Sequence, residues 1–180
     1  MLPRKPIPPQ PWAEQEPTSI ADAYREAALA ARQRLSAFQQ YLKQFEAPDR
    51  KVLVDIKTES SFVKKAARKP VREIHDVLRG AILTTTSSDT DTVADRISHD
   101  ALQGDYKSRQ SNLRGYFGAY HFKIPVSGMA AEIQVMPEHL WVYKELDHNR
   151  YDEQRCGKVD RSAVGFSRWL YDTANKEVVR

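Results

Sequence analysis

Apolar residues recur along a long early segment of the chain with alternating spacings of four and three. The stripe comprises Tyr24, Ala28, Ala31, Leu35, Phe38, Leu42 and Phe45. This period places the side chains on one face of an α-helix of about seven turns. Ser19 and Asp22 form a capping-box pair that marks the start of the helix. We expect the stripe to pack on the protein's own core, and a partner-binding helix is the alternative.

Strand-like and helix-like patterns alternate along the rest of the chain. Strands are predicted over 51–56, 81–86, 116–126 and 129–136, and helices over 59–69, 92–102, 137–155 and 164–174. Residues 87–91 are predicted as a loop. Ser127 and Gly128 form a turn that joins the last two strands into an antiparallel hairpin. The alternation favours an α/β (α+β) fold, with a mixed β-sheet flanked by helices.

Six prolines fall within the first 17 residues, a density that excludes a helix or a central strand there. We expect residues 1–17 to form an extended arm or linker and residues 18–180 to form a single domain. No apolar run approaches the ~20 residues of a membrane helix, and the first residues lack the apolar segment of a signal peptide. The single cysteine, Cys156, excludes an internal disulfide.

Positive charge is concentrated between residues 50 and 72. This segment holds eight Lys or Arg and two acids, a net charge of +6, whereas the whole chain carries +4. A local excess of this kind suits a polyphosphate or a nucleic-acid backbone. A solvated helix face with several lysines would give the same pattern, so charge alone leaves both interpretations open.

The predicted hairpin carries polar side chains on one face. With a two-residue turn, Lys123 faces Glu132 and His121 faces Gln134, and strand alternation places all four on the same side. The opposite face is apolar and belongs to the core. The polar face is either an ordinary solvated sheet surface or a binding surface that offers an acid, a cation, an imidazole and an amide.

An acidic residue, Asp76, precedes a strand that we expect at the centre of the sheet, where an unpaired charge is costly. Asp76 and Glu132 together are suited to hold Mg²⁺, which takes one or two carboxylates plus phosphate oxygens. An ion pair between Asp76 and Arg79 is the alternative. His148 and Tyr151 share one face of the following predicted helix, where they either close the same pocket or form a packing edge.

Four motifs occur in order between about residues 57 and 155. They are Lys57-x₃-Ser61-x₃-Lys65, Ile74-x-Asp76-x₂-Arg79-Gly80, Gly115-Tyr116-Phe117-Gly118-Ala119-Tyr120-His121, and Glu132-Ile133-Gln134-Val135 followed by His148-x₂-Tyr151. In this order they resemble the synthetase domain of the RelA/SpoT family, the alarmone (p)ppGpp synthetases. The last motif is the most specific of the four. The resemblance implies a mixed sheet flanked by helices, related to that of nucleotidyltransferases.

The resemblance also implies an activity, the transfer of the β,γ-pyrophosphate of ATP to the 3′-hydroxyl of a purine nucleotide. The products would be alarmones of the (p)ppGpp or (p)ppApp type. Asp76 and Glu132 would be the catalytic residues that bind Mg²⁺. We assign ATP contacts to Lys57, Ser61, Lys65, Arg68 and Arg79, and acceptor contacts to Tyr116, His121, Lys123, Gln134, His148 and Tyr151. Tyr116 would stack on the acceptor base.

The departures from the family pattern lie near the acceptor side. The usual Asp-x₂-Gly-x-Arg becomes Asp76-x₂-Arg79-Gly80, Phe117 replaces a common Arg, and Met136-Pro137 replaces Arg-Thr. The acceptor therefore stays open between GDP or GTP, an adenosine nucleotide and the 3′-CCA end of tRNA. A non-catalytic nucleotide-binding module is a further alternative.

The short chain resembles the small alarmone synthetases and the toxic members of the group. A toxin of this kind would act in the cytoplasm, be delivered as a secreted effector domain, and be neutralised by an antitoxin or immunity protein. No membrane association is expected. The sequence leaves the oligomeric state open.

Overall fold

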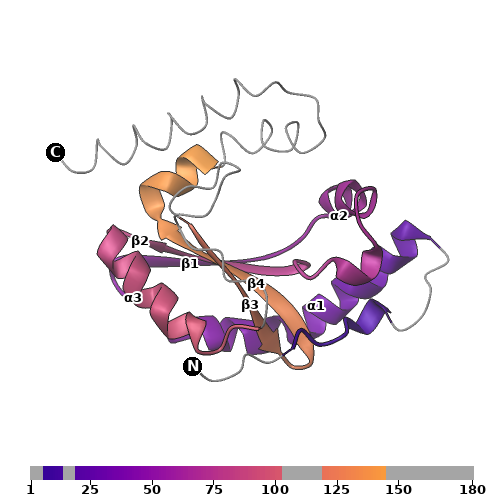
Figure 1. Cartoon of the computed structure of the whole chain (residues 1–180), viewed down its shortest axis with the longest axis horizontal. Helices are drawn as coiled ribbons and strands as arrows, with labels where there is room; N and C mark the ends of the chain where they lie inside the picture. The colour runs from indigo at the N-terminus through magenta and orange to yellow at the C-terminus, as the bar shows by residue number, and fades with distance from the viewer. Residues whose placement is uncertain (1–5, 14–18, 103–118, 145–180) are drawn as a thin grey trace.

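A mixed four-stranded β-sheet forms the centre of the computed structural model, which describes residues 6–13, 19–102 and 119–144 (Figure 1). The strands are β1 (Arg50–Ile56), β2 (Leu78–Thr84), β3 (Tyr120–Val126) and β4 (Met129–Pro137), in the spatial order β1-β2-β4-β3. β1 runs antiparallel to β2, β2 parallel to β4, and β4 antiparallel to β3. Helices flank the sheet, so the predicted fold class is confirmed.

Helix α1 (Ile20–Lys43) packs lengthwise against the sheet, on the same side as α3 in Figure 1. The hydroxyl of Ser19 accepts a hydrogen bond from the Asp22 backbone N–H at 3.1 Å and donates one to the Asp22 carboxylate at 2.6 Å. The predicted pairing of Ser19 with Asp22 at the start of the helix is therefore confirmed. Phe38 and Leu42 are fully buried in the core, which confirms that the apolar stripe packs within the protein.

Gly80 in β2 sets how closely α1 approaches the sheet. A Cβ atom at this position would lie 2.8 Å from Cδ1 of Leu42 and 3.0 Å from Cζ of Phe38. Carbon atoms do not normally approach so closely, so the contact requires glycine. Since successive residues of a strand point to opposite faces, Arg79 and Ala81 point away from α1.

The main core therefore lies on one face of the sheet, between the strands and α1, and a smaller buried cluster that includes Ala81, Leu83 and Met136 lies on the opposite face. The buried side chains of the hairpin in the main core are Phe122, Ile124, Ile133 and Val135. The hairpin has the predicted two-residue turn, with Val126 paired to Met129 and Ser127-Gly128 between them. The polar side chains of the hairpin occupy the other face, as predicted.

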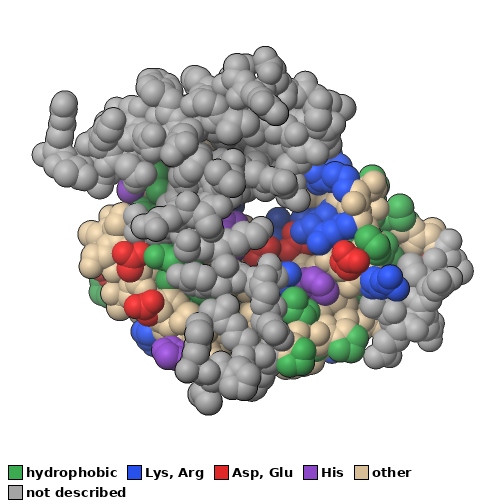
Figure 2. Space-filling model, viewed as in Figure 1, with side chains coloured by type: hydrophobic (Ala, Val, Ile, Leu, Met, Phe, Trp, Pro, Cys, Tyr) green, Lys and Arg blue, Asp and Glu red, His purple; other side chains and the backbone are tan. Residues whose placement is uncertain are grey.

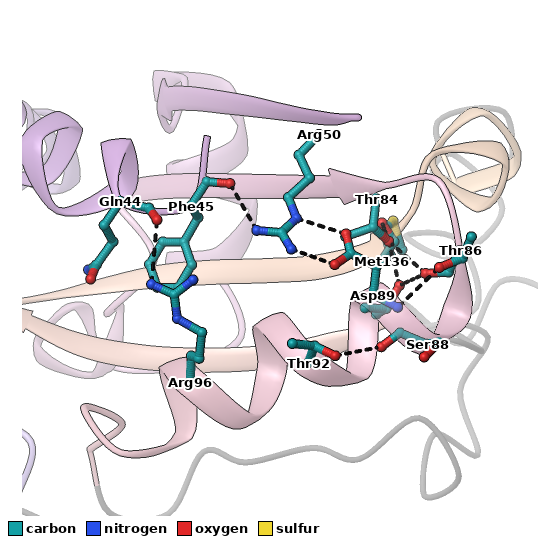
Figure 3. Close-up of polar contacts among 11 residues, drawn as sticks. Gln44, Phe45, Arg50, Thr84, Thr86, Ser88, Asp89, Thr92, Arg96 and Met136 are labelled. Atoms are coloured by element: carbon teal, nitrogen blue, oxygen red, sulfur yellow. Dashed lines mark hydrogen bonds and ion pairs between the residues drawn. The ribbon is translucent and has the colours of Figure 1, made fainter. Parts of the chain in front are cut away.

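Helix α3 (Ser87–Ser98) corrects the predicted loop over 87–91, because the loop residues form its first turn. Thr86 caps the helix by accepting a hydrogen bond from the Asp89 backbone N–H at 3.1 Å. Ser, Thr and Asp are typical both of loops and of helix starts, which explains the error. Arg50 of β1 donates to both carboxylate oxygens of Asp89 and ties α3 to the edge of the sheet (Figure 3). The helix ends at Ser98, earlier than predicted.

Two short elements lie near the start of β2. Helix α2 (Glu59–Ala66) begins after its cap Thr58 and ends before the predicted limit at residue 69. A 3-10 turn, η2 (Val71–Glu73), leads into β2, which begins at Leu78, three residues earlier than predicted. A second 3-10 turn, η1 (Pro11–Ala13), packs against α1 and η2 and buries Trp12. This part of the Pro-rich arm therefore packs against the domain.

β4 continues to Pro137, and residues 138–144 are helical. The later part of the helix predicted over 137–155, the whole helix predicted over 164–174 and the start of the strand predicted at 116 lie outside the described residues. No helix within the described ranges has the length and apolar character needed to cross a bilayer.

Candidate active site

Four charged residues of alternating sign form a row across the sheet, one from each strand. Asp55 of β1 is the register partner of Arg79 of β2, Arg79 is the partner of Glu132 of β4, and Glu132 is the partner of Lys123 of β3. Register partners in a sheet project to the same side, which here is the face opposite α1. Arg79 donates a hydrogen bond to the Asp55 carboxylate. The predicted pairing of Lys123 with Glu132 is confirmed.

The adjacent row contains the amide and imidazole predicted to accompany Glu132. Gln134 is the register partner of His121, as predicted. The Gln134 side-chain amide donates to Oε1 of Glu132 at 2.8 Å, and Nδ1 of His121 lies 4.0 Å from the same oxygen. The Glu132 carboxylate thus lies among an amide, an imidazole and the Lys123 ammonium.

Asp76 lies just before β2 and is buried between two lysines. Its Oδ2 accepts hydrogen bonds from Nζ of Lys57 at 3.1 Å and from Nζ of Lys65 at 2.6 Å. Burial by itself raises the pKa of Asp76, but the two ammonium groups outweigh it and hold the pKa well below its usual value. Oδ1 is also buried, and no described residue forms a hydrogen bond with it. The alternative of an ion pair between Asp76 and Arg79 is not what the structure shows, because Asp76 pairs with the two lysines and Arg79 with Asp55.

The two lysines reach Asp76 from different elements. The backbone N–H of Lys57 donates to the carbonyl of Val77 at 2.8 Å, which continues the β1–β2 pairing past the end of β1 and brings Lys57 beside Asp76. Burial lowers the pKa of Lys57, and the neighbouring Lys65 and Arg79 add to the effect. Lys65 lies in the last turn of α2, whose start is set by the Thr58 cap.

The side chains of Asp76 and Glu132 both influence Lys123. The pKa of Lys123 is lowered mainly by burial, while the carboxylates of Glu132 and Asp76 both oppose that shift. One ammonium group is therefore within electrostatic range of both carboxylates, although they are far apart in the sequence. The magnesium site itself stays a prediction.

The donor set of this region fits magnesium held jointly with a phosphate ligand. Asp76 offers a buried oxygen that no described residue occupies, and Glu132 offers a second carboxylate that influences the same Lys123 ammonium group. Among the residues that the structure describes, no cluster of three or more His, Cys, Asp or Glu is arranged to hold a metal ion. Mg²⁺ usually takes one or two carboxylates and completes its shell with water and substrate phosphate.

Two residues that sequence reasoning missed belong to the same region. His75 is half-buried, and its pKa is lowered to about 4 by burial first and then by Lys123, Lys69 and Lys65. The imidazole is therefore neutral at pH 7. Lys69 lies close enough to affect both His75 and Lys123. The sequence contained a signal for each of them, because Lys69 belongs to the basic segment and His75 is next to Asp76.

Some of the remaining predicted site residues are described by the structure and others are not. Ser61 lies in the first turn of α2, where its hydroxyl accepts from Thr58 at 3.0 Å. Arg68 follows α2 and donates to the backbone carbonyl of Lys64 at 3.2 Å. Neither makes a hydrogen bond to Asp76. Tyr116, His148 and Tyr151 lie outside the described residues.

Basic side chains dominate the surface beside this site. Figure 2 shows Lys and Arg side chains gathered near α2, next to acidic and histidine side chains. The basic segment predicted from the sequence thus supplies one wall of the site, through Lys57, Lys65 and Lys69. A surplus of positive charge next to two carboxylates is suited to a ligand that carries phosphates together with a divalent cation.

Comparison with known proteins identifies the fold. No protein-family model and no curated protein sequence matches the chain. The structure is similar to small alarmone synthetase 2 from Bacillus subtilis, with a TM-score of 0.67 at 18% identity over 86% of this chain and 94% of that one. For small alarmone synthetase 1 from Bacillus subtilis bound to its product pppGpp, the TM-score is 0.56 at 18% identity, over 86% and 88%.

The type VI effector Tas1, in complex with its immunity protein, gives a TM-score of 0.58 at 18% identity, over 90% of this chain and 99% of that one. The chain therefore has the fold of a RelA/SpoT synthetase domain, as the four motifs predicted. The comparisons cover nearly the full length of these neighbours.

Proposed function

We propose that this protein is a pyrophosphokinase that transfers the β,γ-pyrophosphate of ATP to the 3′-hydroxyl of a purine nucleotide. The observation that carries the proposal is the burial of Asp76 between Lys57 and Lys65, with Lys123 under the influence of both Asp76 and Glu132. The fold shared with alarmone synthetases supports the same reaction class.

In this reaction the acceptor 3′-oxygen forms a bond to the β-phosphorus of ATP. The bond between that phosphorus and the α,β-bridging oxygen breaks, AMP leaves, and the hydroxyl proton passes to solvent or to a nearby base. Negative charge is spread over the oxygens of the transferred group, so positioning and electrostatic stabilisation supply most of the catalysis. Bound Mg²⁺ would neutralise part of this charge, with Asp76 and Glu132 as its protein ligands.

The charge balance of the site supports a triphosphate ligand. Among the residues that the structure describes, five cations stand against three carboxylates in this region. The cations are Lys57, Lys65, Lys69, Arg79 and Lys123, and the carboxylates are Asp55, Asp76 and Glu132. The lysines have long stems whose ammonium groups reorient easily, which suits contacts with successive phosphate oxygens. Lys57 and Lys65 are the residues that we assign to the donor phosphates.

The acceptor is proposed to be a guanosine or adenosine nucleotide, with tRNA as the alternative acceptor. Gln134, His121 and Lys123 line the face on which it would lie, beside Glu132, which we assign to the metal. Similarity of fold to Tas1 supports a growth-inhibiting role and an immunity or antitoxin protein as a partner.

A labelling experiment tests the reaction and the acceptor together. The protein is incubated with γ-labelled ATP, Mg²⁺ and either GDP, GTP, ADP, AMP or deacylated tRNA, and the labelled product is identified. Label in a nucleotide would support alarmone synthesis, and label in tRNA would favour the alternative acceptor. If no acceptor gains label while the protein is folded, the proposed function is wrong. Asp76→Asn serves as the inactive control.

A further inference from the structure

Lys57 and Lys65 contact the same oxygen of Asp76, and both contacts are shielded from water. The side chains of Lys57 and Asp76 are 8% and 10% exposed, and that of Lys65 is 20% exposed. The other oxygen of Asp76 is buried, with no hydrogen bond from any described residue. The carboxylate that we propose as a metal ligand is therefore already bound to two ammonium groups of the protein.

We propose that these two lysines make metal binding by Asp76 conditional on a bound triphosphate. In the nucleotide-free protein, Lys57 and Lys65 neutralise Asp76 and repel a divalent cation. When a triphosphate binds, its oxygens attract the ammonium groups, and the carboxylate becomes available to the metal. The inference rests on the proposed function in one respect, that Asp76 is a metal ligand.

The local charges support the binding of the triphosphate before the metal. Two ammonium groups and one carboxylate carry a net charge of +1, so a free divalent cation approaching Oδ1 meets repulsion that burial strengthens. Glu132 adds a negative charge, but Lys123, its register partner, offsets it. The site therefore has little attraction for a bare cation, although its carboxylates are the ligands that the cation prefers.

A triphosphate reverses this balance because it brings several negative charges and many acceptor oxygens. Lysine forms charge-assisted hydrogen bonds with phosphate, and its long stem permits the ammonium group to move between neighbouring acceptors. Phosphate oxygens also complete the coordination of the metal. Linkage then requires that the metal raise the affinity for the nucleotide by the same factor by which the nucleotide raises the affinity for the metal.

Mn²⁺ is a suitable probe, because it prefers oxygen ligands as Mg²⁺ does and its free concentration can be followed by electron paramagnetic resonance. Binding is measured without nucleotide and with an ATP analogue whose α,β-bridge is a methylene group, which blocks transfer. For the wild-type protein we expect Mn²⁺ to bind at least about tenfold more tightly when protein and analogue are both present than to the protein or to the analogue alone.

The lysine variants provide the sharper test. Lys65→Met should raise the affinity of the nucleotide-free protein for Mn²⁺ by at least about tenfold and reduce the enhancement by the analogue. The double variant Lys65→Met/Asp76→Asn should lose this added affinity for Mn²⁺, which would show that the added affinity depends on the Asp76 carboxylate. Lys64→Met is the matched control, since Lys64 is an exposed neighbour in the same helix turn with no bond to Asp76, and it should bind Mn²⁺ as the wild type does.

Removal of one lysine leaves the other on Asp76, and circular dichroism and thermal unfolding show whether each variant is folded. Lys57→Met is a second variant for the same test. The inference is wrong if the nucleotide-free wild type binds Mn²⁺ as tightly as the complex with the analogue, or if folded Lys65→Met binds it no more tightly than Lys64→Met. Because no transfer is measured, failure of the labelling experiment would leave this result interpretable by itself.

Discussion

Arg79 and Glu132 are register partners in the only parallel strand pair among the described strands, β2 and β4. Asp76 precedes Arg79 by three residues, so in this parallel register it lies level with the start of β4, three residues before Glu132. Two carboxylates that are distant in the sequence thereby act on one ammonium group, that of Lys123. The parallel register therefore helps to bring both carboxylates near Lys123, which supports the proposed site.

Neutralising either carboxylate should abolish transfer without unfolding the protein. We expect Glu132→Gln to lower kcat by about 10²–10³-fold, comparable to removal of one preorganised charge-stabilising group. The amide keeps the shape of the side chain, so the thermal midpoint should stay close to that of the wild type. Full activity in Glu132→Gln or Asp76→Asn would contradict the metal assignment.

The protein should lose stability as the pH falls from about 6.5 to 4, in part because of His75. Its pKa is about 4 in the folded protein and 6.5 unperturbed, so the unfolded chain binds more protons in this range. The loss from this half-exposed ring should be about 1–2 kcal/mol after allowance for solvent screening. Urea unfolding in the presence of EDTA, at about pH 7.0 and about pH 4.5, measures the difference in the free energy of unfolding across this range.

His75→Gln should show a smaller loss of stability between the two pH values than the wild type. The Asp76 carboxylate does not produce the same effect, because its depressed pKa acts only below the unfolded value of 3.8. Its contribution is present above that pH and is lost as the pH falls further. Equal pH dependence of the wild type and His75→Gln would show that His75 is not shielded as the structure indicates.

A methyl group at position 80 should destabilise the domain. In Gly80→Ala the new Cβ would meet Leu42 and Phe38 at 2.8 and 3.0 Å, and overpacking of this kind costs about 1–3 kcal/mol. Urea unfolding of Gly80→Ala, Leu42→Val and the double variant forms a thermodynamic cycle. We expect the double variant to be more stable than additivity predicts, because the shorter side chain relieves the clash.

The hairpin was the part of the site that sequence could predict in detail. A two-residue turn fixes the register of both strands, so the pairing of Lys123 with Glu132 followed from Ser127-Gly128 and alternation alone. The apolar face of the hairpin and of α1 followed in the same way from periodicity. Local rules are sufficient where one turn or one helix determines which residues share a face.

The partners of Asp76 could not be predicted, because they come from separate elements. Arg79 was the alternative partner that the sequence offered, but it bonds to Asp55 across the sheet instead. Residues three apart along an extended chain point to opposite sides. Lys57 and Lys65 approach through the β1–β2 pairing and the orientation of α2. These relationships depend on tertiary packing and not on spacing.

Tyr116 lies outside the described residues, and its role remains a prediction from the sequence motif. If its ring stacks on the acceptor base, Tyr116→Ala should remove about 1–3 kcal/mol of binding. The acceptor KM should then rise more than the ATP KM. Steady-state kinetics with each substrate varied in turn measure both constants. Equal changes in the two constants would argue against base stacking, and Tyr116→Phe, which retains the ring, is the control.

Arg79 and Asp55 form an ion pair, and we expect Arg79 to contribute to ATP binding and Asp55 to contribute little to either ATP binding or stability. The Asp55 side chain is 60% exposed and that of Arg79 is 31% exposed, and ion pairs at the surface stabilise proteins by less than about 1 kcal/mol. Asp55→Ala should therefore change stability little.

Arg79 faces the site in the row that contains Glu132, and loss of a charge-assisted bond to phosphate costs about 1.5–3 kcal/mol. Arg79→Ala should therefore raise the ATP KM by about 10–100-fold, whereas Arg79→Lys should restore part of the loss because it keeps the charge. An unchanged KM in Arg79→Ala would remove Arg79 from the ATP site, and an equal rise in Asp55→Ala would show that Asp55 must hold the guanidinium in place for ATP to bind.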